Sequence, residues 1–142
     1  ILYDVVAEII SRDDRIRSIT ESLDVQSNCY NRVGTFDLVF SGDNTNFSPG
    51  YFIQEISSLL KRLEEDDLKL AKEQILEDYY KKINDKASFS YLLARTQLLY
   101  GDHKKLVDYP KELEKIELKD IKRVLTNLSS SKYVYLFMKM GK

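Results

Sequence analysis

The segment IELKDIKRVLTNLSSSKYVYLFM, residues 116–138, places a helix pattern directly before a strand pattern. A helix is predicted from about Lys119 to Leu128, and a run of three serines follows it. The strand predicted over Tyr133 to Met138 is apolar on both faces, so we expect it to lie inside a sheet. The end of the chain therefore combines helical and sheet structure.

The spacing of apolar residues predicts further helices upstream of this segment. The acidic residues 64–67 favour a helix N-terminus, and Pro49 suits the first turn of the helix before it. Asp13 and Asp14 can cap a helix, and Gly101 provides a stop. The predicted helices cover residues 2–10, 15–23, 48–63 and 68–83, and the stretch from Ser88 to Gly101.

Residues 25–41 change to a period near two, which is typical of strands. Two strands joined at Val33-Gly34 are predicted to form a β-hairpin. With the C-terminal strand the sheet has three strands, which is thin for a chain of this length, so we expect more strands upstream of Ile1. The predicted fold class is α+β, with helices layered on a small, mainly antiparallel sheet, in one domain over residues 1–142.

The charge balance and hydropathy exclude several classes of partner. The 22 basic and 23 acidic residues nearly cancel, which gives electrostatic binding to nucleic acid little support. The longest apolar run, Tyr133 to Met138, is far shorter than a membrane span. We expect a soluble protein of the bacterial cytoplasm or periplasm. Because the chain starts at Ile1 inside a helix pattern, we also expect it to be the C-terminal part of a larger protein.

The chain has one histidine, His103, and one cysteine, Cys29. A catalytic zinc site usually takes three protein ligands with imidazole common among them, so no metal site is predicted. His103 is interpreted as a solvated loop residue, and Cys29 as a small packing residue in a strand. The carboxylates at 64–67 are interpreted as a helix cap rather than an acid/base pair. No catalytic residue is predicted.

The final strand carries an aromatic face formed by Tyr133, Tyr135 and Phe137. One interpretation is a strand packed on both sides within the sheet. The alternative is a partly exposed aromatic surface that binds an extended chain or a partner domain.

Several motifs, taken in order, resemble the C-terminal half of zinc peptidases of the pitrilysin/insulinase type. No single motif is specific, because each is structural, and the resemblance depends on their order over nearly the whole chain. The matching pieces are Val5 to Ile10 followed by Asp14 to Leu23, Asp66 to Lys72, Tyr100-Gly101, and Ile116 to Leu128.

The resemblance implies that zinc is held by the N-terminal half of the protein and not by this chain. The C-terminal half of these peptidases contributes an arginine and, seven residues later, a tyrosine that help to hold the substrate and its oxyanion. Here the arginine falls on Arg17, a candidate substrate-binding residue, and the tyrosine position falls on Asp24. An anionic carboxylate cannot donate a hydrogen bond to an oxyanion, so the pair is broken.

Three functions remain open at this point. The first is a non-catalytic C-terminal domain of a zinc-dependent peptidase, which closes a chamber over an extended peptide together with the N-terminal half of the same protein. The second is a structural or partner subunit of the same fold without peptidase activity. The third is an unrelated α+β interaction domain. The family assignment requires the strand from Tyr133 to Met138 to join a sheet with the 25–41 hairpin.

Overall fold

The computed structural model of the protein describes residues 1–29, 33–41 and 49–136. Within these ranges it is mostly helical, with one two-stranded antiparallel sheet, which confirms the predicted α+β class. The elements are α1 (Leu2–Arg12), α2 (Asp14–Ser18), β1 (Ser22–Cys29), β2 (Gly34–Ser41), α3 (Pro49–Arg62), α4 (Glu65–Asn84), α5 (Lys86–Tyr100), α6 (Lys105–Glu114) and α7 (Leu118–Ser130).

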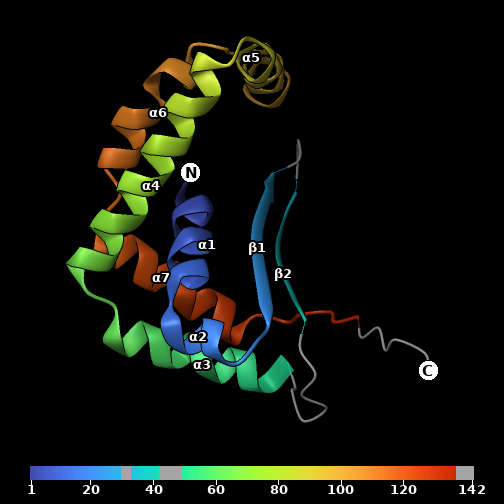
Figure 1. Ribbon diagram of the computed structural model, residues 1–142, viewed down its shortest axis with the longest axis vertical. Helices are drawn as coiled ribbons and strands as arrows, with labels where there is room; N and C mark the ends of the chain where they lie inside the picture. The colour runs from blue at the N-terminus through green and yellow to red at the C-terminus, as the bar shows by residue number, and fades with distance from the viewer. Residues whose placement is uncertain (30–32, 42–48, 137–142) are drawn as a thin grey trace.

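Helix α1 lies at the centre of the molecule, between the hairpin on one side and α4 on the other (Figure 1). Helices α3 and α7 pack against each other at one end, whereas α5 lies at the opposite end, beyond the tips of α4 and α6. The buried core joins α1, α2, α3, α4, α6 and α7. Its fully enclosed side chains include Val5, Val6, Ile10, Ile16, Ile56, Leu113, Ile121 and Leu125.

The hairpin has the register that its alternating pattern requires. Val25 pairs with Leu38, and both side chains pack against the core cluster. The opposite face carries Asp24, which is exposed, and Asn28, whose side-chain amide donates to Asp37 at 2.8 Å. One face is therefore apolar and covered by α1, while the other is polar, as expected for a sheet with one solvated side.

The helix boundaries follow from capping groups. Glu64 and Asp67 form a capping box at the start of α4, so the cap interpretation of residues 64–67 is confirmed. The Asp85 carboxylate accepts from the Ser88 N–H at 2.8 Å, and the hydrogen bonds from Ser88 lower the pKa of Asp85. Helix α5 ends at Gly101, whose φ of 70° is left-handed and favours glycine.

Two helix predictions need correction. The helix predicted over residues 15–23 ends at Ser18, because the chain turns into the hairpin and the Glu21 N–H bonds to the Ser41 carbonyl at 2.9 Å. Helix α6 was not predicted, since Pro110 lies inside it and has no N–H for the Leu106 carbonyl. The Tyr79 hydroxyl of α4 donates to that carbonyl instead, at 3.0 Å.

The predicted C-terminal strand is wrong for the residues that the structure describes. Residues 133–136 form no strand, and Phe137 and Met138 lie outside the described ranges. Val134 is 100% exposed and Leu136 is 85% exposed. The segment leaves α7 and runs past the end of the hairpin (Figure 1). Among the described residues no strand pairs with it, so its β-forming sequence alone does not make it a strand.

No helix of the described part combines the length and apolarity needed to cross a bilayer.

Candidate functional site

The candidate site is built around α2, the short helix that carries Arg17. The Asp13 carboxylate caps this helix, since its Oδ1 accepts from the Ile16 N–H at 2.9 Å. Ile16 is fully buried and anchors the helix in the core. The cap and the anchor together fix α2 at the junction between α1 and the hairpin.

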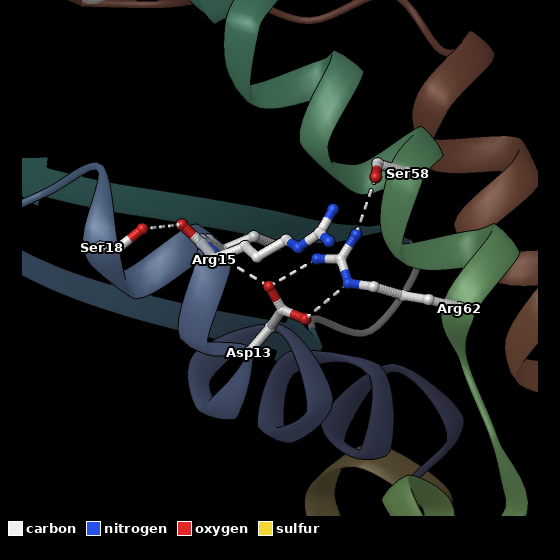
Figure 2. A network of polar contacts seen from close by, with 6 residues as sticks. Asp13, Arg15, Ser18, Ser58 and Arg62 are labelled. Carbon is white, nitrogen blue, oxygen red and sulfur yellow. Dashed lines mark hydrogen bonds and ion pairs between the residues drawn. The ribbon is translucent and has the colours of Figure 1, made fainter.

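An ion pair ties the same junction to the end of α3. The Arg62 guanidinium donates to both carboxylate oxygens of Asp13, through Nη2 at 2.6 Å and Nε at 3.2 Å. Its Nη1 donates to the Ser58 hydroxyl at 2.9 Å. Figure 2 shows the Asp13 side chain, between α1 and α2, and the Arg62 side chain, at the end of α3, pointing toward one another. Asp13 therefore holds α2 both as a cap and as an ion-pair partner.

A hollow of about 450 Å³ opens beside this network. Its charged side chains come from α1, α2, the cap between them and α4, and comprise two arginines and three aspartates. The lining residues are Ile9, Arg12, Asp13, Asp14, Arg17, Leu59, Asp67 and Leu70. The hollow therefore combines hydrogen-bond donors and acceptors of both charges with the apolar side chains of Ile9, Leu59 and Leu70.

Arg17 is exposed at this hollow. Among the described residues its guanidinium makes no hydrogen bond or ion pair, whereas Arg12 lies 3.7 Å from the Glu8 carboxylate. A guanidinium presents five N–H donors in a rigid fork that matches carboxylates and carbonyl groups. Arg17 thus lies exposed at the hollow with no polar partner for its guanidinium among the described residues.

Asp24 lies on a different element, on the exposed face of β1. Its carboxylate accepts from the side-chain amide of Gln26 at 2.5 Å. No hydrogen bond or ion pair joins Asp24 to Arg17 in the described part of the chain. The two positions that the resemblance pairs are therefore not joined by a polar contact.

His103 and Cys29, whose residue types are common zinc ligands, lie on separate parts of the structure. His103 is exposed in the connection between α5 and α6, where its ring Nδ1 lies 3.2 Å from the Gln97 amide oxygen. Cys29 ends β1, and nothing is described of its side chain. Among residues 1–29, 33–41 and 49–136, no three His, Cys, Asp or Glu side chains gather as a metal site would need.

A second hollow, of about 250 Å³, is lined by residues of α4 and by Glu114 of α6. One of these lining residues, Lys72, has a structural role. The Lys72 ammonium donates to the carbonyls of Glu114 at 3.0 Å and Ile116 at 2.6 Å. These carbonyls lie at and just beyond the C-terminal end of α6, where a cation is favourable. Lys72 therefore acts as a cap supplied by another helix.

The aromatic face predicted for the final strand is exposed where it is described. Tyr133 is 54% exposed and Tyr135 is 66% exposed, so the interpretation of a strand packed on both sides is wrong for these residues. Phe137 lies outside the described ranges.

No family model matches this chain, and no curated protein is similar to it. Its fold is similar to the crystal structure of a protease from Helicobacter pylori, with a TM-score of 0.62 and 16% sequence identity. The similarity covers 89% of this chain and 34% of that one, so the chain spans about a third of the length of the protease. At this identity the likeness shows the fold alone.

Proposed function

We propose that this chain is the non-catalytic C-terminal part of a zinc-dependent peptidase of the pitrilysin/insulinase type, which closes a chamber over an extended peptide. The observation that carries the proposal is the likeness of its fold to a protease over 89% of the chain. The described residues 133–136 do not pair with the hairpin as the family assignment requires, which counts against the pitrilysin/insulinase type. The proposal therefore rests on the fold formed by the other residues.

In this proposal zinc and the catalytic residues belong to the N-terminal half of the protein, or to a partner subunit. The chain would contribute binding only, through Arg17 at the edge of the hollow beside α2. The unpaired guanidinium can donate to a carbonyl or carboxylate of the peptide. The aspartates around it would discriminate against strongly acidic substrates.

Arg17→Ala in the complete protein is expected to raise the KM for a fluorogenic peptide about tenfold, with kcat little changed. A hydrogen bond to a charged group contributes about 1.5–3 kcal/mol, and each 1.4 kcal/mol is about tenfold in affinity. Arg15→Ala is the matched control, because Arg15 is an exposed arginine on the same helix that does not line the hollow. Equal KM values for the two variants would refute the role of Arg17. A complete protein that neither binds zinc nor hydrolyses peptides would refute its assignment as a peptidase.

The second candidate is a structural or partner subunit without peptidase activity. It is favoured by Asp24, whose carboxylate stands where the resemblance calls for a hydroxyl donor. Because Asp24 is exposed on a solvated sheet face, a tyrosine fits there without repacking the core.

Asp24→Tyr in the complete protein tests whether the missing donor limits activity. We expect it to increase kcat for peptide cleavage, since one oxyanion donor contributes on the order of 100-fold. Asp37→Tyr, on the same face of the hairpin, is the control. An unchanged kcat in a protein that binds zinc would contradict the broken-pair interpretation.

A further inference from the structure

Helix α5 carries apolar side chains on several sides, interspersed with polar ones, and none of its residues is buried. Its main contacts are with α4 and α6, at the end of the molecule away from the core (Figure 1). Leu92, Leu93 and Leu99 are partly buried, while Tyr91 and Leu98 are 66% and 83% exposed. The exposed tyrosine and leucine form an apolar stripe on one side of α5 that no described part of the chain covers, and such a stripe on a helix normally faces other protein.

The uncovered side has the spacing of a helix-packing seam. Ala87, Tyr91, Ala94 and Leu98 are all exposed and follow one another at intervals of four, three and four residues. This is the a/d repeat along which two helices interdigitate, and small residues between large ones leave holes for the side chains of a partner. We call these four residues the α5 seam.

The charges of α5 indicate which charge a helix packed on the α5 seam would carry. Lys86 and Arg95 are its charged residues, and the helix has no carboxylate. Neither side chain makes an ion pair among the residues that the structure describes. Arg95 directly follows Ala94 of the seam, at the flanking position where charges select the partner helix in coiled coils.

We propose that the α5 seam is the docking site of a partner helix with an apolar a/d stripe flanked by carboxylates. A second copy of this chain is a poor occupant, because it would bring two further positive charges and no negative one to the contact. In the solved protease the matching fold makes up about a third of the chain. The rest of that chain is therefore available to pack against it. The site is distinct from the hollow beside α2 and does not depend on peptidase activity.

The test uses the whole 142-residue chain and two labelled synthetic peptides of about three heptads. Both carry leucine at the a and d positions, and one has glutamate and the other lysine at the flanking positions. Fluorescence anisotropy is expected to give a Kd at least about tenfold lower for the glutamate peptide. Arg95→Glu is expected to remove or reverse this preference.

Leu98→Glu is expected to weaken binding of the glutamate peptide about tenfold or more. Val134→Glu is the matched control, since Val134 is 100% exposed and lies in the segment after α7, far from α5 (Figure 1). Circular dichroism checks the fold, with Leu98→Gln as a milder second variant. Absence of binding, equal binding of both peptides, insensitivity to Leu98, or self-association through α5 in sedimentation would each overturn the proposal.

Discussion

Asp13→Ala is expected to lower the free energy of unfolding by about 2–4 kcal/mol. Loss of an N-cap costs about 1 kcal/mol, and removing one partner of a hydrogen-bonded charge leaves the other unsatisfied at a cost of about 1–3 kcal/mol. Asp13 is 12% exposed and Arg62 is 26% exposed, so solvent compensates only part of the loss. Since α2 carries Arg17, the same change also loosens the candidate site.

Urea denaturation of a double-mutant cycle with Arg62→Met separates the two contributions. We expect a coupling energy of about 1–2 kcal/mol for the pair, with the remainder assigned to the cap. Asp14→Ala is the control, because Asp14 is exposed, and should change stability by no more than about 0.5 kcal/mol. A coupling energy near zero would show that the ion pair does not hold α2 to α3.

Leu125→Ala is expected to lower the free energy of unfolding by about 3 kcal/mol, within the usual range of about 2–5 kcal/mol for such changes. Leu125 is fully buried on α7, which packs against both α3 and α1. Its truncation removes apolar contacts and leaves a cavity where three helices meet. Denaturant unfolding measures the loss as a lower midpoint with an unchanged slope.

Thr126→Ala provides the comparison at the neighbouring position. Thr126 is exposed, and its hydroxyl bonds back to the Lys122 carbonyl within the same helix, so a change below about 0.5 kcal/mol is expected. Similar losses for the two variants would contradict the assignment of α7 to the core.

Features set by local chemistry could be predicted from the sequence. Glu64 and Asp67 form their cap within one turn of chain, and Gly101 ends α5 because its backbone is left-handed. The hairpin followed from the alternation of residues 25–41, which places apolar side chains on one face. In each case the deciding interactions join residues that are close in sequence.

Features set by distant contacts could not be predicted in this way. The Asp13–Arg62 pair joins residues 49 positions apart. The sequence contains many aspartates and arginines, so it does not indicate which of them pair. For the final segment, a strand was predicted from local sequence that the structure does not form. Its strand-forming residues have no neighbouring strand in the described part of the chain. Arg17 was selected by resemblance alone, and the hollow beside it became visible only in three dimensions.

The dependence of α6 on α4 has a consequence for the order of folding. A helix of 10 residues with an internal proline is too short to persist alone in water. Tyr79 supplies the bond that Pro110 cannot make, and Lys72 satisfies the carbonyls at the far end across 42 and 44 residues of chain. We therefore expect α6 to become stable only after α4 has formed and the intervening loop has closed, late in folding.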